Sequence, residues 1–157
     1  MTPTELMRRA IALSHEGMRD GVGVGPFGAL IAKDGAIVAE GCNRVVATND
    51  PTAHAEIVAI RAACAALGAF NLAGCEIYTS CEPCPMCLAA IYWARLSRIS
   101  YANNRTDAAR IGFDDDAIYR EIPLPIEARS VPMTRLLADE ARVAFDTWEK
   151  KPDKIRY

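Results

Sequence analysis

The chain has 157 residues, 51% of them hydrophobic, which suits one domain with a full core and is too short for two ordinary domains. Its 18 basic and 20 acidic side chains give a formal net charge of −2, so no overall attraction for a polyanion is expected. No segment has the pattern of a signal peptide or the length of a membrane span. We therefore expect a single cytoplasmic domain over residues 1–157, with no membrane partner and with nucleic acid disfavoured as a ligand.

The N-terminal part of the sequence predicts a helix followed by a β-hairpin. Thr2-Pro3-Thr4-Glu5 is typical of a capped helix start, and we expect that helix over residues 3–20. Two apolar runs follow, over residues 27–33 and 36–42, and the Asp34-Gly35 pair between them is a strong hairpin signal.

The sequence after the hairpin alternates between helix and strand. The expected elements are a helix that begins near His54 and stops at Gly68, a strand over 76–80, a helix over 83–95 and a strand over 98–101. Together with the hairpin they predict an α/β fold, in which helices cover both faces of a mixed sheet. The site is then expected at the carboxyl ends of the strands.

The C-terminal part of the chain is less regular. It contains a short helical piece over 118–121, a proline-marked segment over 123–132, a last helix near 136–148 and a charged tail over 150–157. The chemical motifs therefore lie in the first two thirds of the sequence.

Cys84 and Cys87 have the C-x2-C spacing at which two thiolates bind one metal ion. Pro83 suits the first turn of a helix, where backbone N–H groups and the helix dipole favour thiolates. His54, one of only two histidines, supplies a third ligand at the start of another helix. Three protein ligands with an open fourth position are typical of a catalytic zinc site, so we expect one Zn²⁺ per subunit.

Two other residues compete for this assignment. Cys81 and Cys84 also form a C-x2-C pair, but Cys81 is expected in the turn ahead of the helix, so we assign Cys84 and Cys87 to zinc. His15 lies in the first helical pattern, and we interpret it as an ordinary core or surface residue.

Glu56, two residues after His54, completes the signature H-x-E followed by P-C-x-x-C, which is typical of zinc-dependent base deaminases and in which the glutamate transfers protons. A base must also be oriented. Asn43, at the end of the second expected strand, offers hydrogen bonds to base edges, and Phe27 and Trp93 offer stacking faces. Plain core packing is the alternative for both aromatic residues.

Longer stretches resemble bacterial guanine deaminases of the cytidine deaminase superfamily, over nearly the whole chain. They read GPFGALIAKDGAIVAEGCN, NDPTAHAEIVAIRAA, YTSCEPCPMCLAAIYWAR and TDAARIGFDDDAIYREI, and the chain ends in an aromatic residue. The zinc motifs specify only the superfamily. The GFDD and IYxE segments and the terminal Tyr157 are what resemble the guanine branch.

The resemblance implies a three-layer α/β/α sandwich with a mixed five-stranded sheet. It implies a role in purine catabolism, with guanine hydrolysed to xanthine and ammonia. It also implies a homodimer in which a C-terminal segment of about residues 134–157 is exchanged, so that Tyr157 would close over the partner's pocket. From the sequence alone, the alternative is a disordered terminus.

Matched position by position, Asn43 and Asp115 resemble the base-recognising residues of that family. Asp115 is then a second proton carrier beside Glu56. The adjacent Asp114 and Asp116 leave this choice open, and a solvated loop carboxylate is the alternative for all three.

Three other functions stay open at this stage. The metal motifs fit a cytosine, cytidine or guanosine deaminase equally well. A tRNA wobble adenosine deaminase shares them too, but its phosphate-binding surface would have to come from the four basic residues of the tail. A zinc-stabilised binding module without activity is the non-enzymatic alternative, although Glu56 and the three-ligand set argue against it.

Overall fold

The computed structural model of the protein describes residues 1–19 and 24–156. The chain divides into two compact units, Met1–Asp116 and Ala117–Tyr157. The first unit contains the whole sheet and every predicted site residue except Tyr157, which lies outside the described residues.

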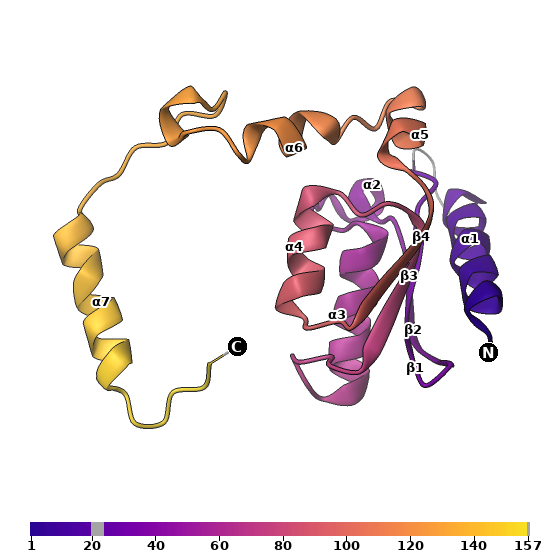
Figure 1. The fold of residues 1–157 in the computed structure, drawn as a ribbon, viewed down its shortest axis with the longest axis horizontal. Helices are drawn as coiled ribbons and strands as arrows, with labels where there is room; N and C mark the ends of the chain where they lie inside the picture. Colours follow the sequence, from indigo (N-terminus) through magenta and orange to yellow (C-terminus); the bar gives the residue numbers. More distant parts are fainter. Residues whose placement is uncertain (20–23, 157) are drawn as a thin grey trace. The chain divides into compact units, whose positions relative to one another are not determined.

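A four-stranded mixed sheet with strand order β2-β1-β3-β4 forms the centre of the first unit (Figure 1). Its strands are β1 (Gly28–Lys33), β2 (Ala36–Cys42), β3 (Cys75–Cys81) and β4 (Arg98–Asn103). β1 pairs antiparallel with both β2 and β3, and β3 pairs parallel with β4. Asp34 and Gly35 form the hairpin turn with φ angles of 51° and 75°, as a tight two-residue turn requires. The four strands and the mixed sheet predicted from the residues are confirmed.

The fifth strand implied by the family resemblance is wrong for the described residues. After β4 the chain forms α5 (Arg105–Arg110), α6 (Asp116–Glu121) and a 3₁₀ turn at Ile126–Ala128, and residues 129–137 have no regular structure. Prolines occur in this stretch at positions 123, 125 and 132. Each proline lacks the backbone N–H that a strand needs in order to donate to its neighbour, which disfavours a fifth strand here.

Helices lie on both faces of the sheet (Figure 1). Alternate residues of β1 point to opposite sides, so Leu30 and Ala32 pack in a cluster with α1 (Pro3–Arg19). Ala29 and Ile31 pack in a second cluster with α3 (Ala55–Leu67) and α4 (Pro85–Trp93). The α/β class is confirmed, and the expected helix over 3–20 is observed as α1, with residue 20 outside the described residues.

Two glycines let these helices approach the sheet closely. A Cβ atom at Gly28 would lie 2.4 Å from the Ala10 carbonyl oxygen of α1. A Cβ atom at Gly41 would lie 2.5 Å from the Ala55 carbonyl oxygen and 2.7 Å from the Ala59 nitrogen, both in α3. Real Cβ atoms do not approach backbone this closely. Gly41 therefore fixes how near the first turn of α3 lies to β2.

Two short helices were not predicted from the sequence, α2 (Val45–Thr48) and α5. At α5 the Asn104 side chain accepts a hydrogen bond from the Asp107 N–H at 3.0 Å, and the Asp107 carboxylate accepts one from the Asn104 N–H at 3.1 Å. This reciprocal pair is a capping box. The signal is present in the sequence as Asn104 followed three residues later by Asp107.

The second unit contains α6 from Ala117 onward, the 3₁₀ turn, the last helix α7 (Ala138–Lys150) and the segments that flank them. No described residue from 117 to 156 is fully buried. Large apolar side chains of this unit are exposed, including Leu136, Val143 and Phe145 at 76%, 63% and 79%. Across the described part of the chain, no helix combines the length and apolarity needed to cross a bilayer.

The close approach at Gly41 predicts that Gly41→Ala destabilises the protein by about 1–3 kcal/mol, because the methyl group collides with backbone that cannot rotate away. Urea unfolding measures this loss. Ala36→Ser, at the exposed start of the same strand, is the control and should change the free energy of unfolding by less than about 0.5 kcal/mol. Equal effects of the two substitutions would contradict the prediction.

Candidate active site

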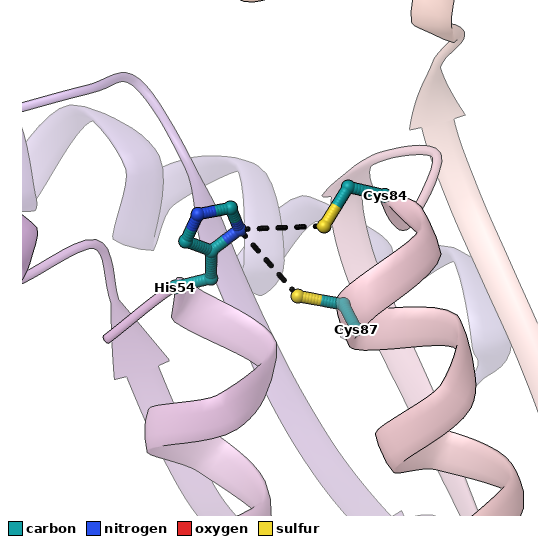
Figure 2. A group of neighbouring side chains, drawn as sticks. All are labelled: His54, Cys84 and Cys87. Carbon is teal, nitrogen blue, oxygen red and sulfur yellow. Dashed lines mark hydrogen bonds between the residues drawn. The ribbon is translucent and has the colours of Figure 1, made fainter. Parts of the chain in front are cut away.

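Three potential metal ligands converge where α3 and α4 begin. His54 is the N-cap of α3, Cys84 is the N-cap of α4, and Cys87 lies in the first turn of α4. Figure 2 shows the three side chains pointing toward one another from the two helix ends. The Nδ1 atom of His54 lies 3.6 Å from the Sγ of Cys84 and 3.5 Å from the Sγ of Cys87.

These separations fit a tetrahedral zinc ion. Bonds of about 2.3 Å to sulfur and about 2.0 Å to nitrogen at a tetrahedral angle place the two donor atoms about 3.5 Å apart. The observed Nδ1–Sγ distances agree with this value, and all three donor atoms lie within 4.8 Å of one another. The structure thus brings together the three ligands that the spacing predicts.

The electrostatics of the two sulfur atoms also suit a cation. A hydrogen bond from Cys87 and the neighbouring His54 lower the pKa of Cys84 to about 4. The same hydrogen bond, together with burial, raises the pKa of Cys87 far above its usual range. Both cysteines lie at a helix N-terminus, where the helix dipole favours negative sulfur.

Cys81 is not part of this cluster. It ends β3, and its Sγ faces the Asn104 carbonyl oxygen at 3.7 Å. Burial raises the pKa of Cys81 to about 11, which disfavours the thiolate that a metal requires. Helix α4 begins at Pro85 and not at the expected Pro83, so Pro85 takes the first helical position behind the Cys84 cap.

Glu56 lies in the first turn of α3, directly beside the three donors. Its side chain is buried, with 6% of the residue exposed. Burial raises the pKa of Glu56 above its usual value. Its Oε2 atom lies 3.5 Å from the Cys87 Sγ, and its Oε1 atom lies 3.4 Å from the Thr79 hydroxyl. A buried carboxyl group in this position is able to accept a proton and to return it.

A cavity of about 230 Å³ opens next to the metal ligands. Among the residues that line it are the following predicted site residues: Phe27, Asn43, His54, Glu56, Cys84 and Asp115. The cavity therefore brings together side chains from strand ends, two helix starts and the loop ahead of α6.

Asn43 and Asp115 contribute different polar groups to the cavity. The Oδ1 atom of Asn43 accepts the Val45 N–H at 3.2 Å, which orients the amide and leaves its NH2 group as a donor for a ligand. The Oδ1 atom of Asp115 is buried and has no hydrogen-bond partner among the described residues. Burial raises the pKa of Asp115. Of the three adjacent aspartates, Asp115 is the one that lines the cavity.

Trp93 is not among the residues that line this cavity, in contrast to our expectation. It is the last residue of α4 and is 61% exposed. It lies nine positions after Cys84, which corresponds to about 13.5 Å along a helix. Within a single chain, Trp93 is therefore remote from the metal site. Tyr157, the other predicted aromatic contact, lies outside the described residues.

Phe113 is a cavity residue that sequence reasoning missed. Its ring packs edge-to-face on Phe27, with centroids 4.8 Å apart and an interplanar angle of 90°. A Cβ atom at Gly25 would lie 3.0 Å from both rings, so glycine leaves room for the pair. The only available signal was its place within the GFDD segment.

The sequence matches, over residues 1–103, a family model described as the cytidine and deoxycytidylate deaminase zinc-binding region. The chain belongs to the cytidine and deoxycytidylate deaminase family. The matched region contains His54, Glu56, Cys84 and Cys87. The metal of this deaminase is therefore zinc, and His54, Cys84 and Cys87 form a potential site for it.

The proteins similar to this deaminase match either its whole chain or only part of it. Guanine deaminase of Bacillus subtilis (strain 168) is 52% identical over 157 residues, which are 100% of each chain. The X-ray structure of guanine deaminase from Bacillus subtilis has a TM-score of 0.95 and covers 100% of this chain and 99% of its own. A guanine deaminase structure from Nitrosomonas europaea is 30% identical, with a TM-score of 0.68, and covers 91% and 81% of the two chains.

A tRNA-specific adenosine deaminase of Agrobacterium fabrum (strain C58) is 49% identical over 99 residues, which are 62% of this chain and 63% of that protein. Its similarity is therefore partial, whereas that of the Bacillus subtilis guanine deaminase extends to the whole chain.

The ligand geometry predicts that the deaminase binds one zinc ion per chain and that Cys87→Ala abolishes this binding, because two donors no longer complete the site. Metal analysis of the purified protein measures the stoichiometry. Cys81→Ala is the matched control and should keep its zinc, because Cys81 contributes no donor. Loss of zinc from the Cys81 variant would instead support the alternative cysteine pair.

Proposed function

We propose that the protein is a guanine deaminase, which hydrolyses guanine to xanthine and ammonia. The observation that carries this proposal is the unpartnered, buried Oδ1 atom of Asp115 in the cavity beside Glu56 and the zinc ligands. A buried acceptor requires a donor, and guanine presents N–H groups along its edge. The full-length similarity to guanine deaminase of Bacillus subtilis supports the same substrate.

The reaction replaces the C2 amino group of guanine by an oxygen from water. When bound, Zn²⁺ supplies Lewis-acid activation of the attacking water. Glu56 accepts a proton of that water and delivers it to the adjacent ring nitrogen. The water oxygen forms a bond to C2, the second proton of that water passes to the amino nitrogen, and the bond from C2 to that nitrogen then breaks with release of ammonia. Asp115 is the second group of the cavity able to carry this proton.

The remaining cavity residues hold the base in place. The NH2 group of Asn43 donates to an acceptor of the base, while the Asp115 carboxylate accepts from a base N–H. Phe27, held edge-on by Phe113, provides a flat apolar face. This combination of one donor, one acceptor and one ring face orients a planar heterocycle.

The second unit is proposed to act through a second copy of the chain. Its described residues include no fully buried side chain, and α7 exposes Val143, Phe145 and Trp148 at 63%, 79% and 44%. Such a surface needs a partner to cover it. We propose a homodimer in which residues of about 134–157 are exchanged, with Tyr157 closing the partner's pocket. The six cysteines form no disulfide among the described residues, which supports a cytoplasmic location.

The proposed reaction predicts ammonia release and xanthine formation from guanine by the zinc-loaded protein. The assay includes guanosine, cytosine, cytidine and a tRNA with a wobble adenosine as competing substrates, with chromatographic identification of each product. Glu56→Ala is the inactive control: it should keep zinc and lose about 10²–10⁴-fold in kcat, because the proton carrier is gone. Turnover of another substrate in preference to guanine would overturn the proposed specificity.

The proposed exchange predicts a dimer in analytical ultracentrifugation and a monomer after truncation at residue 133. Deletion of Tyr157 alone should leave the dimer intact and lower the rate on guanine, because the pocket then stays open. A monomeric full-length protein with full activity would exclude the exchange. An unchanged rate after deletion of Tyr157 would exclude the closing role of that residue.

A further inference from the structure

We propose that Thr79 positions the Glu56 carboxyl group for proton transfer through its side-chain hydroxyl. This inference rests on the proposed function, because it assigns Thr79 a role through the proton carrier of that reaction. It is an indirect role, since Thr79 is not among the residues that line the cavity.

The backbone of Thr79 is held in the middle of the sheet. The residue belongs to β3 and lies opposite Ala29 of the antiparallel neighbour β1 and opposite Tyr101 of the parallel neighbour β4. Only 1% of its surface is exposed. Strand pairing on both sides holds the backbone of Thr79, and therefore its side-chain hydroxyl, in a defined position.

The Thr79 hydroxyl reaches two oxygen atoms. Its single hydrogen has two acceptors within reach, the Cys81 carbonyl oxygen at 3.0 Å and the Oε1 atom of Glu56 at 3.4 Å. The carbonyl oxygen only accepts hydrogen bonds, whereas a hydroxyl group both donates and accepts. By rotation of its single hydrogen, Thr79 remains a partner of Glu56 whether the carboxyl group carries the transferred proton or not.

The second side-chain contact of Glu56 is with a metal ligand. The Cys87 Sγ lies 3.5 Å from the Oε2 atom of Glu56 and donates to it. Cys87 is one of the three donors that converge on the metal site, whereas Thr79 is not. Of the described side chains in hydrogen-bonding contact with this carboxyl group, Thr79 is therefore the one that lies outside the metal site.

A carboxyl group that transfers protons has to keep its position through the reaction. Small displacements of such a group cost large factors in rate, because proton transfer requires hydrogen-bonding distance at both ends. The Glu56 side chain leaves α3 and is free to rotate about its own bonds, whereas Thr79 is fixed in β3. The hydrogen bond from the Thr79 hydroxyl therefore holds the Glu56 carboxyl group in a fixed position relative to the sheet.

The test compares three variants of full-length, zinc-loaded protein with the unchanged protein. Thr79→Val keeps the shape of the side chain and removes the hydroxyl, whereas Thr79→Ser keeps the hydroxyl. Ser80→Ala is the matched control, because its neighbouring buried hydroxyl accepts the Gly28 N–H at 3.0 Å on the other side of the strand. The measurements are kcat and KM on guanine, zinc content and melting temperature.

We expect Thr79→Val to lower kcat by about ten- to a hundred-fold with KM and zinc content nearly unchanged, the loss expected for one hydrogen bond to a charged group. Thr79→Ser should restore kcat to within about threefold, and Ser80→Ala should lower the melting temperature without this fall in kcat. If the valine variant loses zinc, Thr79→Ala gives the same comparison without a hydroxyl.

Two outcomes would overturn the inference. The first is an unchanged kcat in a zinc-loaded variant without the hydroxyl, and the second is an equal fall in kcat for the valine and serine variants. Failure of the proposed function is recognised separately, because the unchanged protein would then release no xanthine from guanine.

Discussion

The close packing of α3 against β2 at Gly41 is the constraint on which the site depends. It sets the position of the first turn of α3, which carries His54 and Glu56. The other half of the site is set by the end of β3, which leads directly into Cys84 at the start of α4. Distances of 3.5 and 3.6 Å between the nitrogen and the sulfur atoms leave little tolerance for movement of either helix. The sheet therefore fixes the positions of the two helix N-termini that form the metal site.

The site residues that could be predicted are those that belong to short local sequence patterns. The C-x2-C spacing, the single nearby H-x-E and the helix starts were sufficient to select His54, Glu56, Cys84 and Cys87, and the structure brings these residues together. The choice against Cys81 followed from its place ahead of the helix, and its direction toward the Asn104 carbonyl oxygen agrees with it. The hairpin was predictable because Asp-Gly specifies its own turn.

Contacts that depend on tertiary packing were not predictable. The residues themselves do not distinguish the three adjacent aspartates, because one residue of loop displacement decides which carboxylate is buried, and Asp115 was chosen from the family resemblance alone. Trp93 was predicted as a stacking residue from its chemistry alone, and it does not line the cavity of its own chain. Phe113 was missed because only folding brings it onto Phe27. The fifth strand was inferred from resemblance alone, and the described residues after β4 do not form it.

The absence of a buried residue in the described part of the second unit has a consequence for the cell. A helix of 13 residues, the length of α7, is marginal in water without tertiary contacts. Under the proposed exchange, its order comes from another subunit and therefore obeys mass action. The fraction of closed pockets then rises with the concentration of the protein. At concentrations near the dissociation constant of the dimer, total activity increases more steeply than the number of chains. The activity per chain is then controlled by the expression level.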